Sequence, residues 1–497
     1  MSSSQPPPTP SPSSSAPAPA SADPTLTAKR KADSNAHDPA ISPPPTKRKI
    51  QSSVSSKVVA NFFTPTSQKP AAKTSVIWEE RAPVHGLPVT LLVGTCRPDG
   101  CKDVTATRKR WCSVAAFDLD STLITTASGK KHAVSATDWK WWDASVPKRL
   151  RDLHDQGFII VILSNQGGLV LPTDIKIRGR PPPPLKPGAL ERLANFKQKC
   201  AAVLTELGVP VKLYAATGRD QFRKPRIGMW QEMVHELELL GEEHGQRELD
   251  YDESFFVGDA AGRVAILRDL KLVPQDFGCS DRNMAANIGL DFQTPEEYFL
   301  GEAPRHFARD FDLADYPFDA AAAAAGPRPP GFSKTNRQEL VVLTGPPGAG
   351  KSTFCRTYLE RMGYERVNQD LLRSKDRCIK RATALLESGK SVVIDNTNPD
   401  PASRSVWIDI GIAKRVVVRC VWFNVTKALC EHNEAVRWQT KSLNPEERGT
   451  LPRFAFNAFF SRFQEPKTYE GFYDVTRIDF KFTGTAEEYE IWGTYWL

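Results

Sequence analysis

One stretch in the second half of the chain restricts the possible folds of this sequence more than any other. The apolar residues 340–343 are followed by a glycine-rich turn and then by Lys351-Ser352-Thr353. The apolar run predicts a buried strand of a parallel sheet, and the residues after the turn predict the start of a helix. Strand, glycine turn and helix in this order form the pattern G-x-x-x-x-G-K-[ST], which binds the phosphates of a nucleotide.

The residue types of this pattern explain its chemistry. Glycines let backbone N–H groups close around phosphate oxygens at a helix N-terminus, whose dipole favours anions. The lysine reaches the β- and γ-phosphates, and the following hydroxyl can be a ligand of Mg²⁺. A glycine turn that binds nothing is the alternative, and the lysine, the hydroxyl and the flanking strand together argue against it. The residues expected to bind the nucleotide are Gly345, Gly348, Gly350, Lys351, Ser352 and Thr353.

Length and composition allow about three domains in these 497 residues. No apolar run approaches the roughly 18–20 residues that a membrane span requires, and the N-terminus has no apolar signal segment. Nine cysteines without a C-x-x-C pair predict reduced thiols in a cytosolic or nuclear protein. The net charge of +8 lies mostly in residues 1–73, which hold nine Lys and Arg against three Asp. The charge of the remaining chain therefore does not by itself predict a nucleic-acid partner.

Residues 1–74 are rich in Ser, Pro, Ala and Thr and cannot bury enough apolar surface to fold, so we expect a disordered tail. The clusters Lys29-Arg30-Lys31 and Lys47-Arg48-Lys49 are typical of a bipartite nuclear import signal. They predict an import receptor as a partner and a nuclear location. A solvated basic tail that touches phosphate non-specifically is the alternative.

An apolar patch interrupts this tail. The patch Val59-Ala60-Asn61-Phe62-Phe63 resembles the h-x-x-F-F box of proteins that bind the sliding clamp PCNA, although Ser56 stands where that box has Gln. PCNA is therefore a candidate partner, and a random apolar patch is the other interpretation.

The middle of the chain contains four apolar runs that each end in polar residues. Helical segments such as 187–207 separate the runs, and this alternation predicts a parallel sheet. Because ligands bind beyond the carboxyl ends of parallel strands, we expect the four polar clusters to converge. The runs are 114–117, 158–163, 212–216 and 254–257, and the clusters are Asp118-Leu119-Asp120, Ser164-Asn165-Gln166, Thr217-Gly218-Arg219 with Arg223-Lys224-Pro225, and Gly258-Asp259.

The side chains in these clusters suit phosphoryl transfer. Asp118 and Asp120, two residues apart at a strand end, can act as nucleophile and as acid/base. Asp259 can complete a Mg²⁺ site of oxygen ligands, and Lys224 can oppose negative charge on the phosphoryl oxygens. A D-x-D pair alone is weak evidence, and four ordered clusters strengthen the hypothesis. The expected phosphate-binding residues are Ser164, Asn165 and Lys224, and the expected metal ligands are Asp118, Asp120 and Asp259, with Ser352 in the second half of the chain.

These ordered motifs resemble those of the haloacid-dehalogenase (HAD) phosphatases. The resemblance implies that Asp118 forms an aspartyl-phosphate and that Asp120 protonates the leaving oxygen and then activates water. Ser121 stands where the D-x-D-G-T motif of that family often has Gly. The stretches 281–290 and 294–300 resemble one branch, the polynucleotide kinase 3′-phosphatases, in which a P-loop kinase follows the phosphatase. The resemblance covers residues 76–497 and implies ATP and Mg²⁺ as cofactors.

In the second half, the resemblance implies that Asp370 is the general base for a 5′-hydroxyl and that Arg437 stabilises the transition state. Gln369 stands where the family usually has Arg. Arg404 is a second candidate for the transition-state role, and a surface salt bridge is the alternative for either arginine. Asp395 is interpreted as a carboxylate near Mg²⁺ or as a substrate-side ligand, and both alternatives remain open.

Two aromatic groups have more than one interpretation. Trp139-Lys140-Trp141-Trp142 can stack the bases of a single strand, but a loop packed on the phosphatase domain is favoured. Phenylalanines at helical spacing near the C-terminus predict core positions. These residues are Phe454, Phe456, Phe459, Phe460 and Phe463.

We therefore predict an α/β protein with two doubly wound parallel-sheet domains. The expected segments are a disordered tail at 1–74, a HAD-like 3′-phosphatase domain at 75–302, a low-complexity linker at 303–336 and a P-loop 5′-kinase domain at 337–497. We expect no forkhead-associated domain in the tail, unlike vertebrate members of the family. The expected enzyme is a monomer that heals DNA ends at nicks, gaps and breaks, without a membrane partner. The alternatives are RNA end repair, a metabolite kinase/phosphatase and a non-enzymatic repair scaffold.

Overall fold

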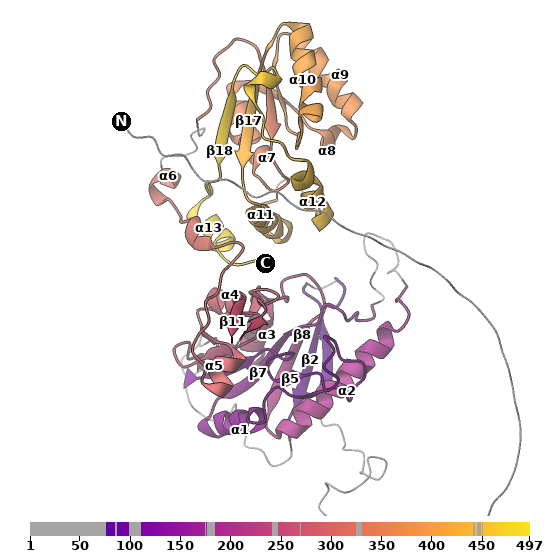
Figure 1. The fold of residues 1–497 in the computed structure, drawn as a ribbon, viewed down its shortest axis with the longest axis vertical. Helices are drawn as coiled ribbons and strands as arrows, with labels where there is room; N and C mark the ends of the chain where they lie inside the picture. The colour runs from indigo at the N-terminus through magenta and orange to yellow at the C-terminus, as the bar shows by residue number, and fades with distance from the viewer. Residues whose placement is uncertain are drawn as a thin grey trace, which may run out of the picture. The chain divides into compact units, whose positions relative to one another are not determined.

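The computed structural model describes residues 76–497 with the exception of 85–86, 99–110, 174, 176–183, 241–246, 269, 325–330, 441–442, 445–448 and 450. The predicted tail, with its two basic clusters and the patch at 59–63, lies outside the described residues. Two sheets organise the described part of the chain (Figure 1). Within that part, no helix has both the length and the apolar character needed to cross a membrane.

The first sheet has seven strands in the order β1-β2-β8-β7-β4-β10-β13. From β8 to β13 the strands run parallel, which confirms the prediction made from the four apolar runs. At one edge, β1 and β2 add an antiparallel pair, so the sheet is mixed rather than wholly parallel. The strands are β1 (Val76–Arg81), β2 (Leu91–Cys96), β4 (Val114–Phe117), β7 (Ile159–Asn165), β8 (Val211–Ala216), β10 (Phe255–Val257) and β13 (Asp291–Gln293).

Helices cover both faces of this sheet. Along β4, Ala115 and Phe117 belong to one buried core, and Val114 and Ala116 belong to the other, because side chains alternate along a strand. A strand that is buried on both faces is apolar throughout, which explains the uninterrupted runs in the sequence. The helices are α1 (Val146–Gln156) and α2 (Ala189–Leu207) on one face, and α3 (Gly228–Glu236) and α4 (Ser280–Ile288) on the other.

The second sheet has five strands, all parallel, in the order β15-β16-β14-β17-β18. Its helices also cover both faces, and the predicted doubly wound arrangement is confirmed. The strands are β14 (Glu339–Thr344), β15 (Tyr364–Val367), β16 (Ser391–Ile394), β17 (Val417–Asn424) and β18 (Val475–Asp479). The helices are α9 (Lys375–Glu387) and α10 (Pro401–Lys414) on one face, and α7 (Lys351–Phe354), α11 (Lys427–Gln439) and α12 (Arg453–Arg462) on the other.

Shorter elements connect the strands and helices. The predicted linker contains the short helix α6 (Ala320–Ala324). Phe311, earlier in the linker, stacks on His432 with a centroid distance of 4.2 Å. The other elements are β3 (Trp111–Cys112), β5 (Ile124–Thr125), β6 (Lys140–Trp141), β9 (Glu248–Leu249), β11 (Ile266–Arg268), β12 (Lys271–Val273), α5 (Pro295–Leu300), η3 (Leu313–Asp315), α6 (Ala320–Ala324), η4 (Cys355–Leu359), η5 (Glu360–Met362), α8 (Gln369–Leu372), η6 (Thr468–Glu470) and α13 (Ala486–Trp492).

The tryptophan cluster follows the favoured interpretation. Trp139 and Trp141 pack against the first core, and the Trp141 indole N–H donates to Glu206 at 2.8 Å. The C-terminal phenylalanines follow the prediction only in part. Phe456 and Phe459 are buried, but Phe454 is 71% exposed because it lies on the opposite side of α12.

Candidate active sites

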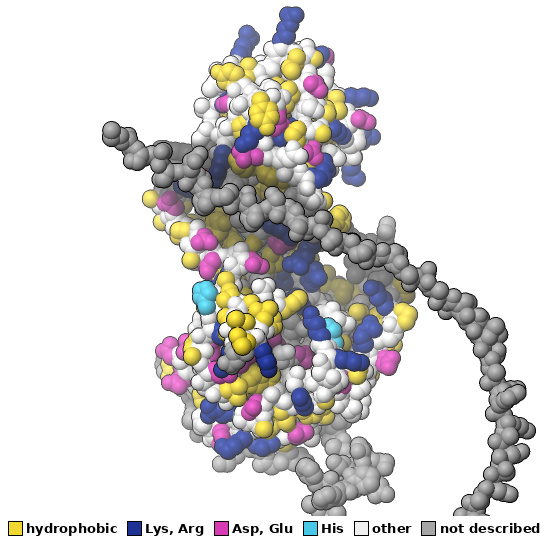
Figure 2. Space-filling model, in the orientation of Figure 1, with side chains coloured by type: hydrophobic (Ala, Val, Ile, Leu, Met, Phe, Trp, Pro, Cys, Tyr) yellow, Lys and Arg dark blue, Asp and Glu magenta, His cyan; other side chains and the backbone are white. Residues whose placement is uncertain are grey.

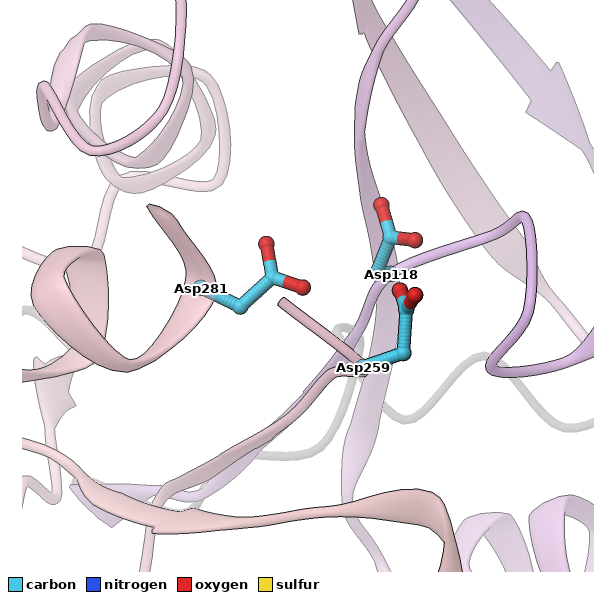
Figure 3. Close-up of side chains that lie close together, drawn as sticks. All are labelled: Asp118, Asp259 and Asp281. Carbon is cyan, nitrogen blue, oxygen red and sulfur yellow. The ribbon is translucent and has the colours of Figure 1, made fainter. Parts of the chain in front are cut away.

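Three carboxylates meet at the carboxyl edge of the first sheet. Asp118 follows β4, Asp259 follows β10, and Asp281 extends toward them from the first turn of α4 (Figure 3). One oxygen of each lies within 4.8 Å of the others. Asp118 and Asp281 are almost completely buried, at 7% and 1% exposure. The predicted convergence of strand ends therefore occurs, and it concentrates negative charge in a small volume.

Lys224 lies among these carboxylates. Its ammonium group is 2.5 Å from Asp118 Oδ1 and 2.8 Å from Asp281 Oδ1, and it also donates to the Leu163 carbonyl at 2.7 Å. Burial lowers the pKa of Lys224, but attraction to Asp118 and Asp281 outweighs this effect and the net shift is upward. Lys224 therefore stays charged at the point where a phosphoryl group would carry its negative oxygens.

One lysine does not balance three carboxylates. Burial raises the pKa of Asp118 and of Asp259, and repulsion between the carboxylates adds to this effect. A divalent cation would relieve the excess of negative charge, and clustered carboxylate oxygens are the ligands that Mg²⁺ prefers. The residues present therefore fit the predicted metal site.

The composition of this cluster differs from the prediction in one residue. Asp281 takes part, whereas the carboxylate of Asp120 does not belong to the cluster. The sequence marked Asp281 only as part of a family stretch. Its signal was an aspartate in the first turn of the helix after the Asp259 strand, and that signal needs the fold to be interpreted.

Two neighbours hold these charged groups in place. The Asn165 amide accepts from the Lys224 backbone N–H at 2.9 Å and donates to the Lys224 carbonyl at 3.2 Å. Asn165, predicted to bind phosphate, thus fixes the backbone of the lysine. Gly258 permits the close approach of Asp281, because a Cβ atom there would lie 2.4 Å from Asp281 Oδ2. The backbone N–H of Ala260 donates to that same oxygen at 3.0 Å.

Asp120 lies beside the cluster with half of its side chain exposed. Gln166 donates to Asp120 Oδ2 at 2.6 Å and also to the hydroxyl of Ser164 at 2.9 Å. Lys199, on α2, lies 3.1 Å from Asp120 Oδ1. Neither Gln166 nor Lys199 was predicted as a site residue, because the contact of Lys199 spans 79 positions of sequence.

Ser121 shows why the family motif often has glycine at this position. Its φ is 66°, in the left-handed region, and its N–H donates to the Ile124 carbonyl at 2.7 Å. A residue with a Cβ is strained in this conformation. The serine therefore preserves the turn at an energetic cost.

The second site lies at the carboxyl end of β14. Gly348 has a φ of 78°, and a Cβ atom at this residue would lie 2.4 Å from the Cys430 carbonyl oxygen. Lys351 is 8% exposed and donates to the carbonyls of Gly345 and Pro346 at 2.8 and 2.6 Å. The predicted strand, turn and helix are thus present, with the lysine folded over its own loop.

Asp395 joins this loop to the neighbouring strand β16. The hydroxyl of Ser352 donates to Asp395 Oδ2 at 2.8 Å, and Arg366 and Asn368 also contact that carboxylate. The oxygens of Ser352 and Asp395 fit the Mg²⁺ that accompanies a nucleotide. Of the two alternatives for Asp395, the structure favours the one near the metal.

Asp370 lies in the first turn of α8, with its side chain exposed to solvent. Asn368 caps this helix, and its side-chain oxygen accepts from the backbone N–H of Asp370 at 2.9 Å. The N–H of Gln369 donates to Asn396, which follows β16 next to Asp395. The first turn of α8, which carries Asp370, is therefore tied to the end of β16.

The two candidate arginines differ sharply. Arg404 is completely buried, and Glu470 holds it with two hydrogen bonds of 2.8 and 2.7 Å. It also donates to the carbonyls of Asn398 and Gln464. These contacts give Arg404 a structural role and do not support a contact with transferred phosphate.

Arg437 lies on α11, the helix that contacts the glycine-rich loop. Asn433, one turn earlier on the same face, donates to the Gly348 carbonyl at 2.9 Å. Arg437 pairs with Glu434, and its Nε atom is buried without a hydrogen-bond partner among the described residues. The geometry thus favours Arg437 over Arg404 for contact with phosphate.

Known proteins resemble both halves of the chain. A family model described as polynucleotide kinase 3 phosphatase matches residues 113–299, and one described as AAA domain matches residues 340–379 and 373–466. The chain is 38% identical over 383 residues to the bifunctional polynucleotide phosphatase/kinase of Schizosaccharomyces pombe, covering 77% of this chain and 82% of that protein. It is 31% identical over 207 residues to the polynucleotide 3′-phosphatase ZDP of Arabidopsis thaliana, covering 38% of this chain and 24% of that protein. Among solved structures, the APS kinase CysC of Mycobacterium tuberculosis has 18% identity and a TM-score of 0.20, over 29% of this chain and 90% of that chain.

Proposed function

This chain belongs to the family of bifunctional polynucleotide phosphatase/kinases, and from that premise we propose how its two sites act on the ends of a broken strand. The protein is an enzyme with a phosphatase half and a kinase half. It removes phosphate from 3′ ends and phosphorylates 5′-hydroxyl ends. The observation that carries the residue assignment is the buried cluster of Asp118, Lys224, Asp259 and Asp281.

In the phosphatase site, Asp118 attacks the phosphorus atom and the bond from phosphorus to the 3′-oxygen breaks. Asp120 gives a proton to the leaving 3′-oxygen and then takes one from the water that hydrolyses the aspartyl-phosphate. Lys224 and Ser164 hold the phosphoryl oxygens, supported by Asn165. A Mg²⁺ ion held by Asp118, Asp259 and Asp281 would neutralise charge on the incoming phosphate.

In the kinase site, backbone N–H groups of the glycine-rich loop bind the ATP phosphates. Lys351 leaves the carbonyls of its own loop to reach the γ-phosphate, and Asp370 takes the proton of the attacking 5′-hydroxyl. Arg437 opposes the charge on the transferred phosphoryl group. Ser352 and Asp395 would hold the Mg²⁺ that accompanies ATP, where it offsets phosphate charge.

The products of the two reactions are a 3′-hydroxyl and a 5′-phosphate, which are the ends that a ligase joins. We assign the enzyme to DNA strand-break repair in the nucleus, with an import receptor recognising the basic clusters and PCNA recognising residues 59–63. On the face drawn in Figure 2, Lys and Arg side chains are mixed with Asp and Glu.

One experiment tests both sites together. A nicked DNA duplex with a 3′-phosphate and a 5′-hydroxyl is incubated with ATP and Mg²⁺, and the same nick is made in RNA. Wild type should convert both ends, Asp118→Asn should lose only the phosphatase, and Lys351→Met should lose only the kinase. If neither end changes while a small phosphomonoester is still hydrolysed, the polynucleotide substrate is wrong. Faster conversion of the RNA nick would overturn the assignment to DNA.

A further inference from the structure

Helix α2 buries one charged side chain among apolar ones. Lys199 is 6% exposed, while the other buried residues of this helix are alanine, leucine, phenylalanine, cysteine and valine. A buried ammonium group loses its hydration, and an apolar residue of similar volume would be cheaper. The position of Lys199 therefore needs an explanation beyond packing.

The contact that balances this charge leads to the phosphatase site. Lys199 Nζ lies 3.1 Å from Asp120 Oδ1 and 5.7 Å from the centroid of the Phe196 ring. Gln166 holds the other oxygen of the same carboxylate at 2.6 Å. Each oxygen of Asp120 therefore has its own contact, Oδ1 with Lys199 on α2 and Oδ2 with Gln166 after β7. Lys197, two positions earlier, instead pairs with Glu80 on β1 and is 29% exposed.

A carboxylate with this much exposure would sample several rotamers without such contacts. Half of the Asp120 side chain faces solvent, whereas the side chain of Lys199 is 8% exposed and fixed by the surrounding core. The buried Lys199 side chain therefore has a fixed position, and its contact orients the exposed carboxylate of Asp120.

We propose that Lys199 is a positioning residue that, together with Gln166, orients the Asp120 carboxyl group toward the leaving 3′-oxygen. The proposal rests on the role given to Asp120 above. In the first step, Asp118 forms a bond to phosphorus and the bond from phosphorus to the 3′-oxygen breaks. Asp120, which must have taken up a proton from water once the phosphate is bound, gives that proton to the leaving 3′-oxygen. Loss of Lys199 leaves the nucleophile, Lys224 and the metal ligands in place but releases the proton donor.

If Lys199 positions the proton donor, the loss of activity on its substitution should depend on the leaving group of the substrate. A general loss of packing around α2 should affect all substrates alike. An alkoxide such as the 3′-oxygen needs a proton as it leaves, whereas p-nitrophenolate leaves without one. The value of kcat/KM reports only the steps up to phosphorylation of Asp118. Lys199 should therefore matter for kcat/KM with a 3′-phosphate and matter little with p-nitrophenyl phosphate.

The test measures kcat/KM for both substrates with the full-length chain and Mg²⁺, for wild type, Lys199→Met, Lys199→Arg and the matched control Lys197→Met. For Lys199→Met we expect a loss of about 100-fold with a nicked DNA carrying a 3′-phosphate, the scale of general acid catalysis, and less than about threefold with p-nitrophenyl phosphate. Because each ratio compares two substrates in one preparation, a partly unfolded sample does not change it. Lys199→Arg should recover part of the loss, and Lys197→Met should behave as wild type.

A second readout examines the later step. If Asp120 is misplaced as a base, hydrolysis of the aspartyl-phosphate slows, and Lys199→Met should release a burst of p-nitrophenolate close to one equivalent per enzyme. Equal losses with both substrates, or no loss with either, would overturn the proposal. Asp120→Asn separates this failure from failure of the proposed mechanism. If Asp120→Asn also shows no difference between the two substrates, then the role of Asp120 is wrong, and with it the basis for Lys199.

Discussion

The two proposed active sites differ in the kind of group that would hold phosphate. The kinase site takes most of its groups from one continuous stretch, the loop of residues 345–353, and uses neutral backbone N–H groups there. The phosphatase site gathers Asp118, Lys224, Asp259 and Asp281 from separate strand ends and a helix, and these groups are charged and largely buried. A dipole-based site costs little free energy when empty, whereas a charge-based site depends on each of its members. The comparison therefore teaches that stability and activity should be coupled in the phosphatase half and separable in the kinase half.

The largest effect should come from removing the lysine of each site. Lys224→Met leaves buried carboxylates without their cation, which should cost about 3–5 kcal/mol of unfolding free energy and abolish phosphatase activity. Lys351→Met should abolish kinase activity with little loss of stability, because the ammonium group of Lys351 donates to two neutral carbonyls, those of Gly345 and Pro346. Urea unfolding of both variants in the absence of Mg²⁺ measures the difference. Equal destabilisation by the two substitutions would contradict the proposed difference between the charge-based site and the dipole-based site.

Removal of Mg²⁺ should lower the stability of the phosphatase half more than that of the kinase half. Mg²⁺ at about 100 times its dissociation constant should stabilise the phosphatase half by about 2.7 kcal/mol, because the ion binds the folded carboxylate cluster. Without nucleotide, the kinase half should respond less. Thermal unfolding with EDTA and with increasing Mg²⁺ tests this difference, and Asp281→Asn should reduce the stabilisation. A shift that is the same in Asp281→Asn as in wild type would exclude Asp281 from the metal site.

Acid should act on the kinase half through His432. Burial lowers the pKa of His432 to about 4, and its Nε2 atom lies 3.0 Å from the Trp492 carbonyl. Below pH 6.5 this histidine takes up a proton in the unfolded chain but stays neutral in the folded chain. The contribution of His432 to the free energy of unfolding is therefore complete above pH 6.5 and is lost as the pH falls toward 4. Stability should decrease by about 1.4 kcal/mol per pH unit in this window, or about 2 kcal/mol at pH 5. Urea unfolding at pH 7 and pH 5 measures it, and His432→Gln should flatten the dependence.

The smallest effect concerns the loop after Asp118. The glycine-rich loop of the kinase has glycine at its left-handed position 348, whereas the phosphatase has Ser121 at φ 66°. Ser121→Gly should remove the strain of a Cβ in that region and raise the unfolding free energy by up to about 1 kcal/mol. Phosphatase activity should not change. A decrease in stability would mean that the serine side chain contributes more than the strain removes.

Much of the fold could be predicted from local pattern. Runs such as 114–117 and 340–343 are apolar throughout because both faces of their strands are covered, and each was predicted as a strand of a parallel sheet. The antiparallel pair β1 and β2 at the sheet edge could not be placed from the sequence, because pairing partners are not local. Phe454 was misplaced because the spacing of five phenylalanines does not say which of them faces solvent.

The same distinction between local and distant residues applies to the candidate sites. The glycine-rich loop is contiguous, so its residues could be predicted together. Asp281 and Lys199 could not, because their importance arises only when the fold brings them to Asp118 and Asp120. Arg404 shows why two interpretations had to stay open, because the sequence does not reveal that this arginine is completely buried and paired with Glu470.

The packing of Gly258 has a consequence for how such a gene can drift. Adding one methyl group there would place a carbon atom 2.4 Å from Asp281 Oδ2 and 2.6 Å from Asp281 Cβ. Every amino acid substitution at residue 258 adds at least a Cβ atom, so each one brings a side chain into conflict with Asp281. A copy of the gene with alanine at this position would keep an intact kinase half beside a phosphatase half in which Asp281 has to move away. We therefore expect gene copies without glycine at this codon to encode a protein with impaired phosphatase activity.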